Sequence, residues 1–278
     1  MSSRRARERL SIVAEYKGKR VDGYIAAGDA LDFLGSIRPE AANIVFLDPP
    51  FNLGKRYYAR KQIDVLPLRV YEGWLKEVLV EAVRILQPGG TLYLYHLPVW
   101  AIRFGEFLDS RLEFRHWIAI AMKNGFIRGK RLYPAHYGLL MFTKGEPARL
   151  SRPKLTPSQC RHCGEYIKDY GGYLPIIEKK GINLSDFWDD LSPVRHANRK
   201  HRDANELPEL LFDRIIDISG SPGELYVDAF AGTGSGVIAA ARKGLRFAAC
   251  DIVHANCNII SRRLDKLIDE LSKKRIHA

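Results

Sequence analysis

The chain has 278 residues, of which 46% are hydrophobic and 27% charged, and its formal net charge is +12. This balance is typical of a globular protein with a sizeable core and argues against a disordered or fibrous chain. The sequence has no apolar stretch of membrane-spanning length, no secretory signal after its basic N-terminus, and only four cysteines, too few for a disulfide framework. We therefore expect a cytoplasmic protein whose surplus of Lys and Arg binds a polyanion.

In chain order, residues 1–20 are predicted to form a basic arm or a solvated helix, and strands and helices alternate from residue 21 to residue 144. Short apolar runs that end in turn-forming residues predict the strands of this half. These strands are Val21–Ala27, Asn43–Leu47, Thr91–Tyr95, Phe114–Met122 and Gly138–Thr143. Apolar residues at helical spacing predict helices over Ala101–Ser110 and over Tyr71–Leu86, which ends at Gln87-Pro88-Gly89-Gly90.

The second half begins after an insertion, residues 145–202, in which Pro, Gly and polar residues dominate and apolar periodicity fades. Beyond it, the same criteria predict three helices and two strands. The helices are Asn205–Ser219, Ser235–Lys243 and Ala255–Lys274, and the strands are Leu225–Phe230 and Arg246–Asp251. Alternating strands and helices predict an α/β fold, in which a mostly parallel sheet is covered by helices on both faces.

A glycine-rich segment, V-D-A-F-A-G-T-G-S-G, occupies Val227–Gly236 between a predicted strand and a predicted helix. Glycine permits a tight turn and lets the backbone approach a ligand at the carboxyl end of the strand. Val237 stands where the dinucleotide fingerprint G-x-G-x-x-G has its last glycine, which argues against NAD without excluding it. Asp251 ends the next strand, where a carboxylate could accept hydrogen bonds from ribose hydroxyls. The alternative is a structural turn beside a surface aspartate.

A second motif, Leu47-Asp48-Pro49-Pro50-Phe51, follows a hydrophobic strand. Two successive prolines fix φ and remove two N–H donors, so the turn is rigid and its carbonyls point outward. A carboxylate, a fixed carbonyl and an aromatic ring are the parts needed to hold an amino group and to stack the base that carries it. Taken alone, the tetrapeptide could also be a rigid turn without a function.

Together, the two motifs resemble those of the amino-group DNA methyltransferases, the N6-adenine/N4-cytosine family. The D-P-P-F tetrapeptide resembles the catalytic signature of that family, and D-A-F-A-G-T-G-S-G resembles its cofactor loop, which is usually closer to D-P-F-x-G-S-G-T. The catalytic motif comes first and an insertion separates it from the cofactor motif, which is the order of the β group. The resemblance covers Tyr24 to Asp251, with further similarities at Gly28-Asp29, His136 and Asn205–Pro208.

The resemblance implies a Rossmann-like methyltransferase fold that binds S-adenosyl-L-methionine. Residues 21–144 would be the catalytic half, 145–202 the target-recognition region and 203–278 the cofactor-binding half. The implied catalytic residues are Asp48, Pro49, Pro50 and Phe51. The implied cofactor-binding residues are Asp29, Asp228, Phe230, Gly232, Thr233, Gly234, Ser235 and Asp251. The target base would be flipped out of the duplex, because its amino group cannot be reached inside the stack. Asn52 would help to hold the loop or the base.

The insertion contains two further patterns. A basic run predicts phosphate contacts with DNA, although charge runs often form plain solvated surfaces. Its proposed DNA-binding residues are Arg195, Arg199, Lys200 and Arg202. The single C-x-x-C of Cys160 and Cys163 favours a tight turn with buried thiols over a zinc site completed by His196 and His201.

The target base and the partners stay open at this point. Asp at the first position of the catalytic motif favours adenine N6, with cytosine N4 as the alternative and RNA not excluded. Two interpretations from other classes are an NAD-dependent oxidoreductase, which leaves the second motif unexplained, and a non-catalytic nucleic-acid-binding protein, which explains neither motif. DNA is the expected partner. The resemblance also allows a homodimer and a cognate restriction endonuclease, for which no residue argues.

Overall fold

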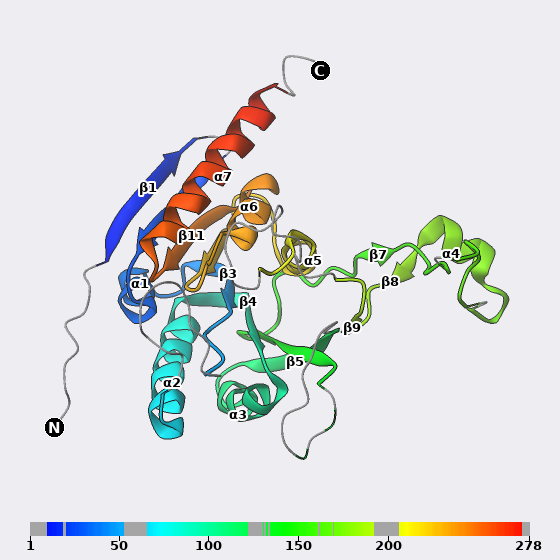
Figure 1. Ribbon diagram of the computed structural model, residues 1–278, viewed down its shortest axis with the longest axis horizontal. Helices are drawn as coiled ribbons and strands as arrows, with labels where there is room; N and C mark the ends of the chain where they lie inside the picture. Colours follow the sequence, from blue (N-terminus) through cyan, green and yellow to red (C-terminus); the bar gives the residue numbers. More distant parts are fainter. Residues whose placement is uncertain are drawn as a thin grey trace.

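The computed structural model describes residues 10–18, 21–52, 66–121, 130, 132, 134–160, 162–168, 170–191 and 206–273. Within these residues, a nine-stranded sheet runs through the molecule with helices on both faces (Figure 1). In spatial order its strands are β1 (Ser11–Lys17), β2 (Asp22–Ala27), β11 (Arg246–Asp251), β10 (Leu225–Asp228), β3 (Ala42–Leu47), β4 (Leu86–His96), β6 (His136–Thr143), β5 (Glu113–Ala121) and β9 (Phe187–Trp188).

The five strands from β2 to β4 are parallel to one another, and β1 and β6 flank them as antiparallel neighbours. In the middle of the sheet, Val227 lies between Val45 on one side and Ala248 on the other. All three side chains are buried, because helices cover both faces of a parallel sheet. The α/β fold predicted from alternating strands and helices is confirmed.

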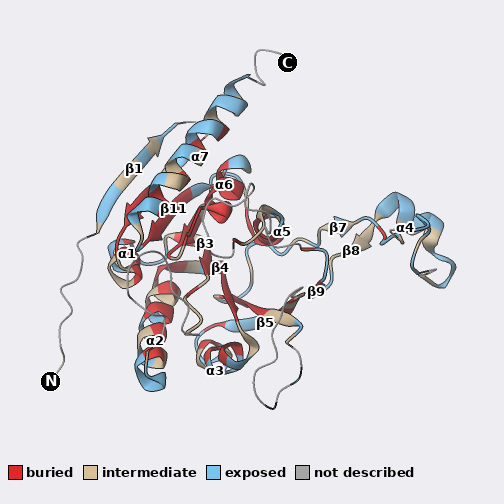
Figure 2. Ribbon diagram, viewed as in Figure 1, coloured by how far each residue is buried: buried red, intermediate tan, exposed pale blue. Residues whose placement is uncertain are grey.

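Among the described residues, three helices pack on each face of the sheet. One face carries α1 (Ala30–Ser36), α2 (Leu68–Ile85) and α3 (Pro98–Asp109), and the other carries α5 (Glu209–Ser219), α6 (Ser235–Arg242) and α7 (His254–Lys273). Each set forms its own apolar cluster with the sheet, and Figure 2 shows the buried residues concentrated there. In α2, for example, Leu75, Val78, Leu79 and Ala82 recur at helical spacing and are fully buried.

The connections diverge between β10 and β3. The chain leaves β10 through α6 and reaches β11 on one side, whereas it leaves β3 through α2 and reaches β4 on the other side. Such a point, where the strand order reverses, opens a crevice at the carboxyl ends of the strands and is the usual ligand site of an open α/β sheet. The topology thus specifies where a ligand site is expected.

The described part of the predicted insertion projects from the body as an arm (Figure 1). It contains β7 (Lys154–Leu155), the 3₁₀ turn η1 (Tyr170–Gly172), α4 (Leu174–Lys180) and β8 (Ile182–Asn183), and its residues are mostly exposed (Figure 2). The arm returns to the sheet through β9, where the buried Trp188 donates its indole N–H to the Ser185 carbonyl at 2.7 Å. Arg214 of α5 forms a two-bond ion pair with Asp190 beside it. These contacts fasten the base of the arm to the body.

Several elements differ from the sequence-based expectation. Residues 11–17 are neither an arm nor a helix but form β1, an edge strand whose Tyr16 hydroxyl bonds to Ser261 of α7 at 2.9 Å. The helix α1 was not predicted, because seven residues are too few to show a helical period. The strand β4 begins at Leu86 instead of Thr91, since Gly89 donates its N–H to the Lys144 carbonyl at 2.7 Å and continues the sheet. The helix α5 begins at Glu209, after Pro208. Among the helices described, none combines the length and the apolar character that crossing a membrane requires.

Candidate active site

The carboxyl ends of four adjacent parallel strands each carry an aspartate. Asp29 follows β2, Asp251 ends β11, Asp228 ends β10 and Asp48 follows β3. We call these four residues the acidic edge. Parallel pairing brings strand ends to the same edge of the sheet, so residues as distant in sequence as Asp48 and Asp228 meet there. Several carboxylates at one strand edge favour a cationic ligand.

Asp48 and the glycine-rich turn line one narrow cleft, which lies at the reversal point between β10 and β3. The residues that line this cleft are Phe46, Asp48, Glu206, Leu207, Phe212, Asp228, Phe230, Ala231, Gly232, Thr233 and Ser235. The structure therefore brings the proposed catalytic acid and most of the proposed cofactor residues together. Asp29 and Asp251 lie at the next two strand ends instead of in the cleft wall. Glu206, a buried residue of the cleft wall, has no role predicted from the sequence.

Asp228 is a strongly perturbed member of the acidic edge. Its side chain is buried, with Oδ1 accepting the Phe230 N–H at 3.0 Å and Oδ2 accepting the Tyr226 hydroxyl at 3.1 Å. Burial raises the pKa of Asp228 to about 7 against the lowering effect of these two hydrogen bonds, and the charges of Asp48 and Asp251 raise it further. Near neutral pH this carboxyl group therefore exchanges a proton, and a cation in the cleft would favour its ionised form.

The glycine-rich turn requires glycine for two different reasons. Gly234 has a φ of 84°, and a Cβ atom there would lie 2.8 Å from Ile260 of α7. Gly236 has no room, because a Cβ atom would lie 2.1 Å from the Tyr226 hydroxyl oxygen. Arg263 of α7 donates to the Thr233 carbonyl at 2.7 Å, a contact that sequence reasoning did not find. The turn is thus supported by β10 and α7 and leads into the N-terminus of α6, where backbone N–H groups favour negative ligand groups.

Asp251 and Asp29 also have structural partners. Asp251 accepts the Gly232 N–H on Oδ2 at 2.9 Å and the Val253 N–H on Oδ1 at 2.8 Å, so it braces the glycine-rich turn. Asp29 caps α1 by accepting the Leu31 N–H at 2.8 Å. Asp251 Oδ1 also accepts the side-chain amide of Asn256 at 3.0 Å. The ribose-binding role of Asp251 and the cofactor-binding role of Asp29 stay predictions.

The Asp48–Phe51 turn is bordered by an aromatic wall. The ring of Phe51 stacks on His96 at a centroid distance of 4.9 Å and lies 5.8 Å from Tyr137 and 6.1 Å from Tyr95. Burial raises the pKa of Tyr95 and Tyr137, and the charge of Asp48 raises it further, which places both phenols in the field of that carboxylate. Sequence reasoning missed Tyr95, His96 and Tyr137 as site residues. The sequence signal for Tyr95 and His96 is their position at the end of β4, the strand next to β3. The signal for Tyr137 is its position directly after His136.

Asn52 closes the loop that follows this turn. Its φ is 54°, its amide Nδ2 donates to the Leu66 carbonyl at 3.0 Å, and its Oδ1 accepts the Leu66 N–H at 2.7 Å. Asn52 thus joins the two ends of a loop whose intervening residues, 53–65, are not described. This geometry supports holding the loop, the first of the two roles expected for Asn52.

Two predictions concern the insertion. The proposed DNA-binding residues, together with His196 and His201, lie within residues 192–205, outside the described residues. Cys160 and Cys163 form the expected tight turn, in which Gly164 donates its N–H to the Cys160 carbonyl at 2.8 Å. The expectation of buried thiols is wrong, because Cys163 is exposed and Cys160 is partly exposed. In the described part of the chain, no three His, Cys, Asp or Glu side chains are grouped to hold a metal ion.

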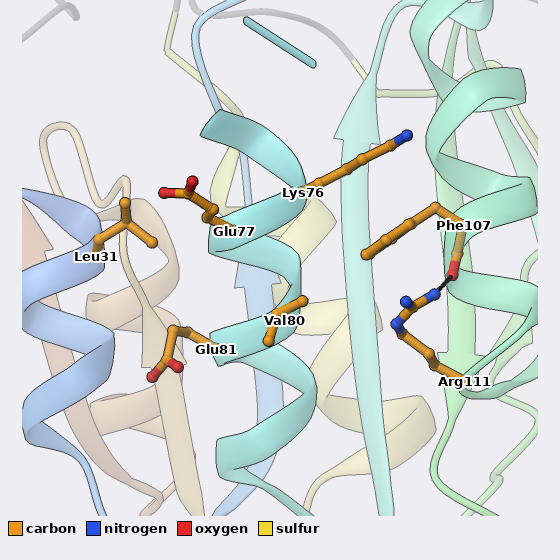
Figure 3. Close-up of a pocket in the computed structure, with 7 residues that line it drawn as sticks. All are labelled: Leu31, Lys76, Glu77, Val80, Glu81, Phe107 and Arg111. Carbon is orange, nitrogen blue, oxygen red and sulfur yellow. Dashed lines mark hydrogen bonds between the residues drawn. The ribbon is translucent and has the colours of Figure 1, made fainter. Parts of the chain in front are cut away.

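A separate groove lies on the outer side of α1, α2 and α3 (Figure 3). Its main feature is Phe107, whose ring has the Arg111 guanidinium at 3.8 Å and the Lys76 Nζ at 5.6 Å. Glu77 and Glu81 extend from the other side of α2, away from Phe107 and toward Leu31 (Figure 3). None of the proposed catalytic or cofactor residues lines it, so the chemistry of the two motifs belongs to the cleft.

A family model of N6/N4 DNA methylases matches residues 42–262, a range that includes both motifs. The chain belongs to this family. The Type II methyltransferase M.BamHI of Bacillus amyloliquefaciens is 39% identical to it over 243 residues, which are 87% of this chain and 57% of that protein. The DNA adenine methyltransferase YhdJ of Escherichia coli (strain K12) is 25% identical over 248 residues, 87% of this chain and 82% of YhdJ. The chain spans less than two thirds of M.BamHI and also of M.HpaI from Haemophilus parainfluenzae, of which it covers 65%.

Solved structures of other methylases share the fold. The putative DNA modification methylase TTHA0409 of Thermus thermophilus, crystallised in complex with S-adenosyl-L-methionine, superposes with a TM-score of 0.56 at 20% identity, over 86% of this chain and 93% of that one. The PvuII DNA methyltransferase, which is cytosine-N4-specific, superposes with a TM-score of 0.60 at 17% identity, over 87% and 86%. The predicted Rossmann-like methyltransferase fold is therefore confirmed.

Proposed function

We propose that this protein transfers a methyl group from S-adenosyl-L-methionine to an exocyclic amino nitrogen of a base in DNA. The observation that carries the proposal is the shared cleft, in which the Asp48 carboxylate and the Asp228–Ser235 turn line one cavity at the reversal point of the sheet. Membership of the N6/N4 DNA methylase family supports the same chemistry. An NAD-dependent oxidoreductase would not need the Asp48–Phe51 turn.

The chemistry of the cleft fits the cofactor. S-adenosyl-L-methionine carries a sulfonium and an α-ammonium group, and the acidic edge offers carboxylates to both. The turn from Ala231 to Ser235, with Phe230 and Asp228, would hold the methionine side of the molecule, and Asp251 and Asp29 would hold the nucleoside side. When bound, the cofactor supplies an electrophilic methyl group. The protein contributes position and electric field, because close alignment of the two reactants lowers the barrier.

The Asp48–Phe51 turn would hold the target. A base flipped out of the duplex would stack on Phe51 and Tyr137, the partly exposed rings of the aromatic wall, which offsets part of the unstacking cost of a few kcal/mol. The Asp48 carboxylate and the Pro49 carbonyl accept the two amino hydrogens and draw the nitrogen lone pair out of conjugation. As the nitrogen gains the methyl group it becomes positively charged, and the Asp48 carboxylate stabilises this charge and accepts the released proton.

Adenine N6 is the proposed target, because Asp stands at the first position of the catalytic motif. Cytosine N4 is the second candidate. The chain is similar in sequence to an adenine methyltransferase, but it shares its fold with a cytosine-N4 methyltransferase, so the fold is compatible with either base. The arm at residues 145–191 and the basic run beyond it would contact the DNA. Digesting methylated DNA to nucleosides and identifying the product by mass spectrometry separates the two bases.

The deciding experiment compares the wild-type protein with Asp48→Ala on unmethylated bacterial genomic DNA. We expect the wild type to transfer labelled methyl groups, and Asp48→Ala to transfer none while binding S-adenosyl-L-methionine with nearly the same Kd in calorimetry. Gly234→Asp is the complementary control, because it should abolish cofactor binding. Normal turnover by Asp48→Ala refutes the mechanism. A wild-type protein that binds NAD instead of S-adenosyl-L-methionine refutes the function.

A further inference from the structure

Two carbonyl groups of the Asp48–Phe51 turn accept hydrogen bonds from side chains of α2 and α3. The Tyr71 hydroxyl of α2 donates to the Pro50 carbonyl at 2.6 Å, and the Trp100 indole N–H of α3 donates to the Phe51 carbonyl at 3.1 Å. Pro49 and Pro50 have no N–H groups, so the turn cannot be fixed through donors of its own at these positions. Its orientation depends on donors from the body of the protein.

His96, at the end of β4, determines the direction of the Tyr71 bond. The His96 side chain is fully buried, and burial lowers its pKa to about 3, so the ring is neutral at physiological pH. Its Nδ1 accepts the Leu97 N–H at 2.9 Å, which leaves the ring proton on Nε2. That Nε2–H therefore donates to the Tyr71 oxygen at 2.7 Å, and Tyr71 must give its own proton to Pro50. The chain of hydrogen bonds has only one direction.

Ring packing prevents these side chains from turning away. The His96 ring lies between Phe51, at 4.9 Å, and Phe104, at 6.2 Å, and is nearly parallel to both. Tyr71 packs against Trp100 at 4.8 Å, and its side chain is 1% exposed. In a buried environment, linked hydrogen bonds strengthen one another. The turn therefore rests on a rigid support built from α2, α3 and β4.

We propose that Tyr71, oriented by the neutral His96, is a positioning residue for methyl transfer. By holding the Pro50 carbonyl, it fixes the turn so that the Asp48 carboxylate and the Pro49 carbonyl meet the amino group of the target base. This inference rests on the proposed function for its substrate. A small misplacement of groups that hold a reactant is enough to cost about 100-fold in rate, so losing one such bond should affect turnover more than binding.

The test compares Tyr71→Phe with Tyr93→Phe, which removes the same atom from another fully buried tyrosine. The Tyr93 hydroxyl bonds to Ser219 of α5 at 3.0 Å, on the face of the sheet opposite Tyr71. We expect Tyr71→Phe to lower kcat by about 10- to 100-fold, with KM for DNA and Kd for S-adenosyl-L-methionine changed less than about twofold. Tyr93→Phe should keep the wild-type kcat. Both variants are assayed well below their Tm values.

A second readout does not depend on activity. Nitrogen-15 NMR of the histidines in the ligand-free protein should show His96 neutral and protonated on Nε2 from pH 5 to pH 8. In Tyr71→Phe the Nε2 proton loses its acceptor and should exchange faster with water, whereas Tyr93→Phe should leave it unchanged. A charged His96, or a proton on Nδ1, overturns the inference.

The kinetic outcomes also separate this inference from the function on which it rests. If the wild-type protein methylates no nucleic acid, the proposed function fails. If the wild type is active and Tyr71→Phe has the same kcat, the positioning role fails and the function stands. An equal loss of kcat in both tyrosine variants also overturns the inference, because it would show a general effect on the core.

Discussion

The raised pKa of Asp228 should make the ligand-free protein less stable as the pH rises, and Asp228→Asn should remove this pH dependence. The carboxyl group has a pKa of about 7 in the folded protein and an ordinary value of 3.8. Between these values the folded state binds more protons than the unfolded state, so the free energy of unfolding falls as the pH rises from about 4 to about 7 and is then constant. Over this whole window the loss amounts to about 4 kcal/mol.

The range from pH 5 to pH 8 is easy to measure and covers most of the window in which the stability changes. Between pH 5 and pH 8 the wild type should lose about 3 kcal/mol relative to Asp228→Asn. For a chain of this size this corresponds to about 6 °C in Tm. Asn keeps an acceptor for the Phe230 N–H and places an amide opposite Tyr226, so the fold should tolerate the substitution.

The assay is thermal unfolding of both proteins without ligand in steps from pH 5 to pH 8.5, with Asp109→Asn, an exposed carboxylate at the end of α3, as the control. The Tm of Asp228→Asn minus that of the wild type should rise with pH and level off above about pH 7, while the control difference stays flat. The affinity of the wild type for the cofactor should instead increase as the pH rises through 7, because the ionised Asp228 attracts the positive charge of the cofactor. Parallel Tm curves for Asp228→Asn and the wild type would refute the reasoning.

Two further predictions concern the arm and the basic run. Backbone N–H groups of Cys163 and His162 lower the pKa of the Cys160 thiol, so iodoacetamide at pH 8 should modify Cys160 before the two cysteines buried in the core, as peptide mass spectrometry can show. Equal labelling of all cysteines would contradict this structure of the arm. Removing three charges from the basic run should make DNA affinity less dependent on salt, by up to about 3 in the slope of log K against log salt; an unchanged slope excludes phosphate contact by Arg199, Lys200 and Arg202.

The two motifs could be read from the sequence because their properties are local. A buried strand, a glycine at positive φ and an amphipathic helix occur within about twenty residues around Gly234, and each depends on its immediate neighbours. The Asp48–Phe51 turn is similar, since proline restricts φ wherever it occurs. Strand β1 and the start of β4 could not be predicted in the same way. Their backbone groups find partners in Ala27 and Lys144, whose positions depend on the fold of the whole chain.

By itself, the sequence determined the α/β class, the order of the motifs and the residue types of the site. Only the tertiary structure decided that Asp48 shares a cleft with the turn after β10, and that Tyr71 and His96 stand behind Pro50. The physical reason is that strand order and burial are set by packing between distant segments. The same packing removes water from Asp228 and His96 and moves their pKa values in opposite directions, to about 7 and about 3.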